Sequence, residues 1–138
     1  MFHLHQISKI KQYLNGDQLK SVVHAYVISR LDQNNSLLLG LPKTLISRLQ
    51  MVQNGAARMI VGARKRDHIT PLLMQLHWLP VEKRIVFKVL LIIYKCKNQI
   101  GPPYLKELLE NYVPPRDLHS VSQDLLLVPH GHYAETRK

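Results

Sequence analysis

The chain has little cysteine and no long apolar run. Cys96 is the only cysteine among its 138 residues, so neither an internal disulfide nor a multi-cysteine zinc site can form. The longest apolar run, residues 89–94, is far too short to cross a bilayer. Polar residues interrupt the apolar ones in residues 1–10, which argues against a secretory signal. We therefore expect an intracellular chain, in the nucleus or cytoplasm, with no membrane partner.

Acidic residues are also scarce, and they are scattered. The chain has nine Asp and Glu residues, and no two of them are adjacent. A two-metal polymerase or nuclease needs several carboxylates that converge on paired Mg²⁺ ions. A Walker-type phosphate loop, a nucleophile elbow and a zinc-protease helix are missing as well. We therefore expect no catalytic residues and no cofactor, so that the chain is not an enzyme on its own.

The eight histidines could suggest a metal site. His3 with His5, and His130 with His132, are spaced two residues apart, but both pairs lie in ends that we expect to be flexible. Zinc requires three or four converging ligands with supporting groups around them. Surface imidazoles are the better interpretation, and we predict no metal site.

What the chain has in excess is positive charge. Nineteen Lys and Arg residues give a formal net charge of +10, which repels itself unless a polyanion lies nearby. An anionic membrane surface would require a basic amphipathic helix with bulky apolar anchors, or a lipid attachment, and neither is evident. Nucleic acid is therefore the first candidate partner.

Helical spacing of apolar residues dominates the pattern and predicts an all-α fold. We expect an irregular bundle of five or six helices with a loose C-terminal tail, and one short strand is possible at residues 125–128. The last helix should end near residue 110. The helices are predicted near residues 4–14, 19–30, 42–61, 71–76, 81–97 and 104–110.

Caps and apolar faces follow from the same pattern. Asp17 is a candidate cap for the second helix, Thr70 for the fourth, and Gly62 is a plausible stop for the long third helix. We expect Gln53 on the outer side of that helix and Tyr26 on the inner stripe of the second. The predicted core comes from three stripes, within residues 19–27, 45–60 and 85–96.

The single tryptophan has two interpretations. His77-Trp78 could stack on a base, because an indole face tolerates any sequence and contributes about 1 to 3 kcal/mol per base. Apolar neighbours surround Trp78 in sequence, from Leu76 to Val81. The stronger expectation is therefore that Trp78 seals the core.

Basic residues gather where the long helix ends. Arg58, Arg64, Lys65 and Arg66 have only Asp67 as a nearby counter-charge. A solvated helix C-terminus explains such a cluster without any ligand, since cations are favourable there. Phosphate contact is favoured because further positive charge extends over the helix at 81–97, at Lys83, Arg84, Lys88, Lys95 and Lys97. We expect the first four of these largely on the outside of that helix.

Short motifs follow one another in a fixed order along the chain. They include Arg30-Leu31-Asp32, Asn35-Ser36-Leu37-Leu38, Gly40-Leu41-Pro42, Leu49-Gln50, Val52-Gln53-Asn54, Ala56-Ala57-Arg58, Arg64-Lys65, Asp67-His68-Ile69-Thr70-Pro71, Leu76-His77-Trp78-Leu79-Pro80-Val81, Arg84-Ile85 and Pro103-Tyr104-Leu105. This ordered series resembles the segment that follows the palm in LINE-type, non-LTR retrotransposon reverse transcriptases. The resemblance covers roughly residues 7–129, and as a series it is more specific than any single motif. Gly55 stands where the family has alanine.

The resemblance implies thumb-like helices in residues 1–62, a downstream helical region in 63–112 and a weakly structured tail in 113–138. The family's catalytic aspartates precede this segment, so the chain would be a catalytically incomplete fragment of an RNA-directed DNA polymerase. It would contact the phosphate backbone of an RNA or RNA–DNA duplex. The alternative is an interaction remnant that packs on a missing palm. The candidate contacts are Arg48, Arg58, Arg64, Lys65, Arg66, Arg84 and Lys88.

Overall fold

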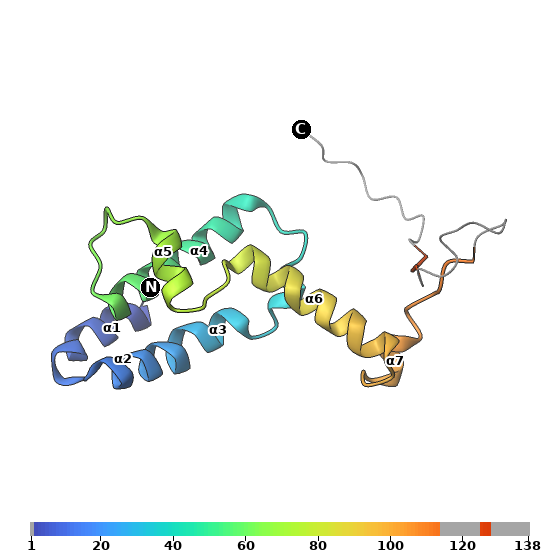
Figure 1. Cartoon of the computed structure of the whole chain (residues 1–138), viewed down its shortest axis with the longest axis horizontal. Helices are drawn as coiled ribbons and strands as arrows, with labels where there is room; N and C mark the ends of the chain where they lie inside the picture. Colours follow the sequence, from blue (N-terminus) through green and yellow to red (C-terminus); the bar gives the residue numbers. More distant parts are fainter. Residues whose placement is uncertain (1, 114–124, 128–138) are drawn as a thin grey trace. The chain divides into compact units, whose positions relative to one another are not determined.

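The computed structural model describes residues 2–113 and 125–127, and in these residues the chain is an irregular all-α bundle without a sheet, which confirms the predicted fold class (Figure 1). Its contacts form two units, Met1–Val89 and Leu90–Lys138, so the first unit extends past residue 62. The elements are α1 Phe2–Ile10, η1 Lys11–Tyr13, α2 Gly16–Val23, η2 His24–Ile28, α3 Ser29–Asp32, η3 Asn35–Leu38, α4 Lys43–Val61, α5 Ile69–Gln75, α6 Val81–Lys97 and α7 Pro103–Lys106.

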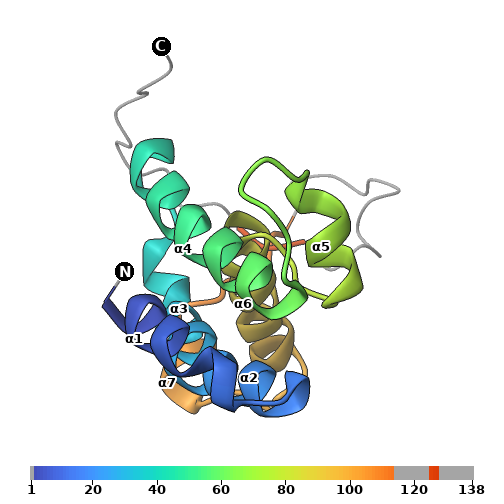
Figure 2. The same cartoon turned by 90° about the vertical axis from the view of Figure 1, so that its left-hand side faces the viewer.

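The first unit begins with an antiparallel helical hairpin, in which α1 is followed by the continuous helix α2–η2–α3 (Figures 1 and 2). Asn15 caps the second helix. Its side chain accepts a hydrogen bond from the backbone of Gln18, whose side chain bonds back to the backbone of Asn15. This reciprocal capping box satisfies two N–H groups that a helix start leaves open. The prediction that Asp17 is the cap was therefore wrong, and Asp17 lies in the first turn.

A π-helical turn, η2, interrupts the regular α-helical spacing of this helix. In an unbroken α-helix the face of Leu19 and Val23 would continue through Tyr26. The wider turn shifts this face by one residue, so that Val27 and Ile28 are buried while Tyr26 is 58% exposed. The expectation of Tyr26 on the inner stripe was wrong for this reason.

The long helix α4 runs back along the hairpin, and α5 packs against it (Figure 1). Gly62 ends it with φ 75, as the sequence predicts, because glycine enters the left-handed region without a Cβ penalty. Gln53 is fully buried, which contradicts its predicted place on the outer side. At α5 the predicted cap Thr70 lies inside the helix, and His68 occupies the cap position.

The core of the first unit lies between α1, α2–η2 and α4. The stripe at 19–27 contributes to it as predicted, whereas Ile85 is buried outside it. The helix α1, which was not among the predicted core stripes, adds Leu4 and Ile7. The buried members of this cluster are Leu4, Ile7, Leu19, Val23, Val27, Ile28 and Ala56.

In the second unit Cys96 is buried and a close turn follows α6. A Cβ on Gly101 would lie 2.7 Å from the Cys96 sulfur, so glycine is required for this approach. The helix α7 is shorter than the predicted helix at 104–110. Within the described residues, the possible strand is an isolated antiparallel bridge between Asn111 and Leu126. The rest of the predicted loose tail lies outside the described residues.

Candidate nucleic-acid interface

The basic residues after α4 lie on a turn that is stabilised by hydrogen bonds of Asp67 and Arg58. The Asp67 carboxylate accepts a hydrogen bond of 2.6 Å from the backbone N–H of Arg64, and the Asp67 N–H bonds back to the Arg64 carbonyl at 3.2 Å. The Arg58 guanidinium donates to the Asp67 carbonyl, at 3.2 Å. Asp67 therefore closes the turn mainly through backbone bonds and is not paired with the neighbouring cationic side chains.

Three side chains on this turn, Arg64, Lys65 and Arg66, are exposed, and we call them the cationic turn. Among the described residues, none of their charged groups takes part in a hydrogen bond or ion pair. Lys11 adds a positive charge at the last turn of α4, where its Nζ donates to the Met59 carbonyl at 2.9 Å. Forty-eight residues separate Lys11 from Met59, so sequence spacing gave no signal for this contribution.

Arg58, predicted as a phosphate contact, is half-buried and supports the turn. Its Nε is buried and has no hydrogen-bond partner among the described residues. Because one edge of its guanidinium is already committed to the Asp67 carbonyl, Arg58 is better suited to positioning the cationic turn than to contacting a ligand.

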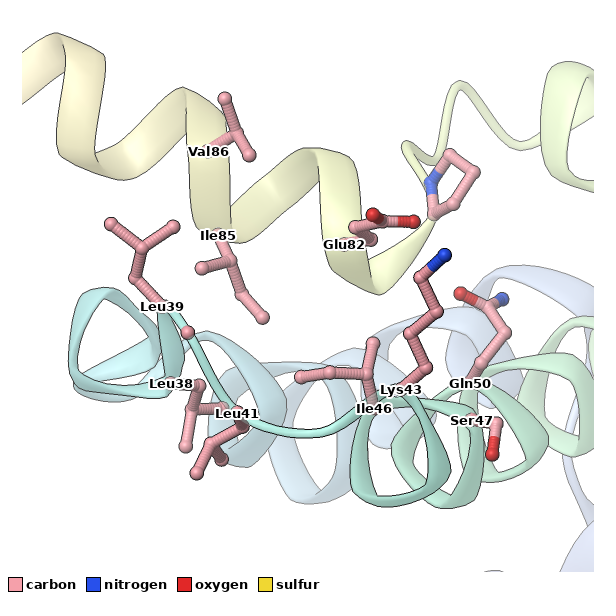
Figure 3. A pocket seen from close by; sticks show the side chains of 12 residues that line it. Leu38, Leu39, Leu41, Lys43, Ile46, Ser47, Gln50, Glu82, Ile85 and Val86 are labelled. Carbon is pink, nitrogen blue, oxygen red and sulfur yellow. The ribbon is translucent and has the colours of Figure 1, made fainter. Parts of the chain in front are cut away.

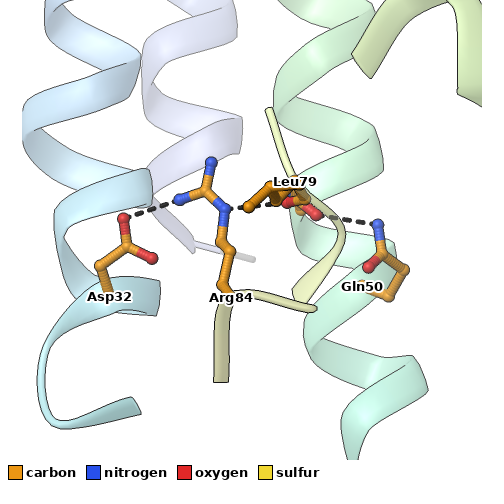
Figure 4. A network of polar contacts seen from close by, with 5 residues as sticks. Asp32, Gln50, Leu79 and Arg84 are labelled. Carbon is orange, nitrogen blue, oxygen red and sulfur yellow. Dashed lines mark hydrogen bonds and ion pairs between the residues drawn. The ribbon is translucent and has the colours of Figure 1, made fainter. Parts of the chain in front are cut away.

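Arg84 is bound inside the first unit rather than directed outward (Figure 4). It forms an ion pair of 2.7 Å with Asp32 and donates from Nε to the Leu79 carbonyl at 2.9 Å. Its guanidinium also lies 5.9 Å from the ring centre of Trp78. The side chain is only 15% exposed, so the expectation of an outer position was wrong.

The same network continues into α4 through glutamine side chains. Gln53 donates to the Leu79 carbonyl at 2.8 Å, and Gln50 donates to Gln53 at 2.9 Å. The Gln50 oxygen accepts a 2.8 Å bond from the N–H of Val81, one of the N–H groups left open at the start of α6. These bonds fix the segment that leads into α6 against α4.

This network joins residues from several of the short sequence motifs. Asp32, Gln50, Gln53, Leu79 and Arg84 come from five separate motifs, and they meet in one set of hydrogen bonds. Buried polar groups need partners, so losing one member would leave the others unsatisfied. The motifs in this region therefore have a structural role.

Trp78 packs against the core as a partly buried side chain. The preceding His77 has φ 54, and the N–H of Trp78 bonds to the Leu73 carbonyl at 2.8 Å, which turns the chain sharply after α5. This agrees with the core-packing interpretation of Trp78. Its ring is also covered on one side by Arg84.

The other two candidates, Arg48 and Lys88, are exposed but stand apart from the cationic turn. Ten residues of α4 separate Arg48 from Arg58, a rise of about 15 Å. Lys88 lies one turn beyond Arg84 on α6. The structure therefore brings Arg64, Lys65 and Arg66 together, with Arg58 behind them, and leaves the remaining candidates at other places.

A cavity of about 320 Å³ lies between η3, the start of α4 and the start of α6 (Figure 3). Leucine, isoleucine and valine make up half of the residues that line it, and Lys43 and Glu82 lie at one end. Several wall residues are exposed although they are apolar: Leu39 is 56% and Val86 41% exposed. This is an unpartnered apolar surface of the first unit.

Two searches of the described residues bear on other functions. No three His, Cys, Asp or Glu side chains gather there in a way that could hold a metal ion. None of the helices in the same residues has the length and apolar character needed to span a membrane. Comparisons with protein-family models, curated proteins and solved structures found no match to the chain.

Proposed function

We propose that the chain is a catalytically incomplete fragment of a non-LTR retrotransposon reverse transcriptase, which contacts the backbone of an RNA or RNA–DNA duplex without performing chemistry itself. The observation that carries this proposal is the cationic turn, three exposed positive side chains with no partner among the described residues, on a turn held in place by Arg58 and Asp67. The family in this proposal rests on the resemblance of the ordered motifs. The net charge of +10 provides long-range attraction to a polyanion.

Phosphate contact follows from the chemistry of the turn. Guanidinium and ammonium groups that lack protein partners can replace the counterions condensed on a duplex. They carry no base-reading geometry, so binding should be independent of sequence. Arg48 and Lys88 are single exposed cations that could extend the contact, whereas Arg84 is committed to Asp32 and contributes to folding.

Salt-dependent binding tests this proposal. If about four phosphates are neutralised, log affinity for a labelled RNA–DNA duplex should fall with log salt at a slope of about −3 to −4. Replacing Arg64, Lys65 and Arg66 together by alanine should reduce that slope by about 2 to 3. Fluorescence anisotropy over a salt series measures both quantities, and a slope near zero for the unmodified chain would refute the proposal.

A matched pair of variants separates the turn from general charge. Lys65→Ala and Lys20→Ala each remove one exposed ammonium group, the first from the cationic turn and the second from α2. We expect Lys65→Ala to lower the slope by about 1 and Lys20→Ala to leave it nearly unchanged. Equal effects would mean that only net charge matters and that the turn is not the contact.

The apolar cavity favours a second candidate, an interaction remnant that packs on a missing palm. On this view the chain alone should self-associate through the exposed wall of the cavity, and a palm fragment should restore solubility. Leu39→Glu should then reduce light scattering, whereas Leu37→Glu, at a 79% exposed leucine that does not line the cavity, should not. Equal scattering from all three proteins would argue against this candidate.

A further inference from the structure

The π-helical turn η2 places two side chains on the surface that regular helical spacing would bury. The face of Leu19 and Val23 would reach Tyr26 and Arg30 in an unbroken α-helix, but the shift of one residue exposes both. Keeping the charged Arg30 out of the core is by itself a sufficient structural reason for the π-turn. The turn alone therefore does not indicate a ligand. What matters is the set of groups that Tyr26 and Arg30 join on the surface.

Two further rings stand beside Tyr26. The His3 ring centre lies 6.4 Å from that of Tyr26 with the planes inclined by 31°, and the Phe2 ring meets His3 edge-on at 5.7 Å. Phe2 is 70% exposed and Tyr26 58% exposed, although both are large apolar side chains. The N-terminal end of α1 and the π-turn thus form one exposed aromatic surface, which we call the aromatic platform.

A cavity of about 260 Å³ opens beside this platform, between Phe2, His3, Tyr26 and the apolar side chains of Leu49 and Val52. Ligand pockets usually measure about 300 to 1,000 Å³, so this one suits a ligand with a single ring system. Its walls are mostly apolar or aromatic and offer few hydrogen-bonding groups. They would bind a flat ring by its faces rather than by its edges.

Positive charge borders the same cavity. Arg30 lines it directly and is exposed. Arg48 is exposed one helical turn before Val52 on α4, and residues four apart lie on the same helix face. Among the described residues neither guanidinium takes part in a hydrogen bond or ion pair. Aromatic rings flanked by free cations match the chemistry of single-stranded nucleic acid, which presents unpaired bases between phosphates.

We propose that the aromatic platform with Arg30 and Arg48 binds an unpaired nucleobase and the phosphates on either side of it, as a single-strand site distinct from the cationic turn. The proposal rests on the proposed nucleic-acid function for the identity of the polymer, but not on duplex binding. It also assigns Arg48, which lies apart from the cationic turn, to a defined site.

An abasic strand tests stacking directly, because it keeps every phosphate and lacks every base. The full-length chain should bind labelled oligo(A) at least about fivefold more tightly than an abasic strand of equal length, measured by anisotropy at one fixed salt concentration. Equal affinity for the two strands, or no binding of either, would overturn the proposal. Binding of the duplex in the same assay reports on the cationic turn, so the two proposals fail separately.

Variants at Tyr26 locate the stacking. Tyr26→Leu should weaken oligo(A) binding at least about fivefold and leave abasic binding unchanged, while Tyr26→Phe, which keeps the ring, should remain within about twofold of the unmodified chain. Tyr13→Leu is the matched control, since Tyr13 is 78% exposed and does not line the cavity. If Tyr26→Leu and Tyr13→Leu behave alike while circular dichroism shows both folded, the site is not at the platform and the surface serves a different partner.

Discussion

Arg84 shows that a single cation can have partners inside the fold which the sequence does not reveal. Its guanidinium joins α3 to the segment before α6 through Asp32 and the Leu79 carbonyl. Arg84→Ala should therefore lower the free energy of unfolding by about 1 to 2 kcal/mol. This is somewhat less than is usual for hydrogen bonds to charged groups, because Asp32 is 41% exposed and solvent screens the ion pair. Urea denaturation followed by circular dichroism measures this change.

Lys88→Ala is the control for this prediction, because Lys88 lies one turn further along α6 and is exposed. Its effect on stability should stay within about 0.5 kcal/mol. Arg84→Lys should behave like Arg84→Ala, since an ammonium group cannot bond to both Asp32 and the Leu79 carbonyl in the same fork. A full rescue by lysine would show that charge alone is needed at this position.

At the scale of residues, the sequence located exposed cations well and buried ones poorly. The turn that carries the three cations at 64–66 can be recognised from its neighbours in sequence. Gly62 ends the helix with a positive φ, and Asp67 accepts a hydrogen bond from the backbone of Arg64. Arg84 was placed outside because helical periodicity assigns a face but does not reveal a carboxylate 52 residues away in sequence. Gln53 was misplaced for the same reason, since its partner is the distant Leu79 carbonyl.

At the scale of elements, the start of α2 depends on the capping box of Asn15 and Gln18. Asn15→Ala removes the side-chain acceptor and should destabilise the chain by about 0.5 to 2 kcal/mol. Asp17→Ala changes only an interaction with the helix dipole in the first turn, which contributes about 0.3 to 1 kcal/mol. Thermal unfolding of the two variants should therefore rank Asn15→Ala as the less stable protein, and the reverse order would restore Asp17 as the cap.

The long helix α4 carries a glycine that its packing does not require. A Cβ on Gly55 would lie 3.4 Å from the end of the Leu4 side chain, an ordinary contact. Gly55→Ala should therefore stabilise the chain by about 0.5 to 1 kcal/mol, as expected for a helix interior. Gly62→Ala, at φ 75, should instead destabilise it by about 1 to 2 kcal/mol. Denaturant melts that show both variants destabilised would mean that Leu4 cannot accommodate the added methyl group.

Element positions followed from periodicity and breakers, but their details did not. The spacing of apolar residues and the Gly-Pro breaks predicted α4 and α6 closely. The π-turn η2 could not be predicted, because its local sequence is compatible with ordinary helix and only the packing of Val27 and Ile28 shows the shift. The aromatic platform depends on that shift, so this site was not visible from sequence.

At the scale of the whole molecule, the two candidate functions place opposite demands on charge. A net charge of +10 draws the chain to a polyanion, and it also keeps like chains apart. The exposed apolar wall with Leu39 and Val86 favours association, which that repulsion opposes. The balance between attraction to nucleic acid and self-association is therefore controlled by ionic strength.

Salt should shift this balance in a defined direction. Raising the salt concentration from about 50 to about 200 mM should weaken duplex binding roughly 60-fold at a slope near −3. The reason is that the release of counterions from the duplex contributes less free energy at higher salt. The same change shortens the screening length between like-charged chains and should leave self-association equal or stronger. Anisotropy and light scattering on one sample follow both processes. Duplex binding that strengthens with salt would mean that apolar contact, rather than the cationic turn, holds the nucleic acid.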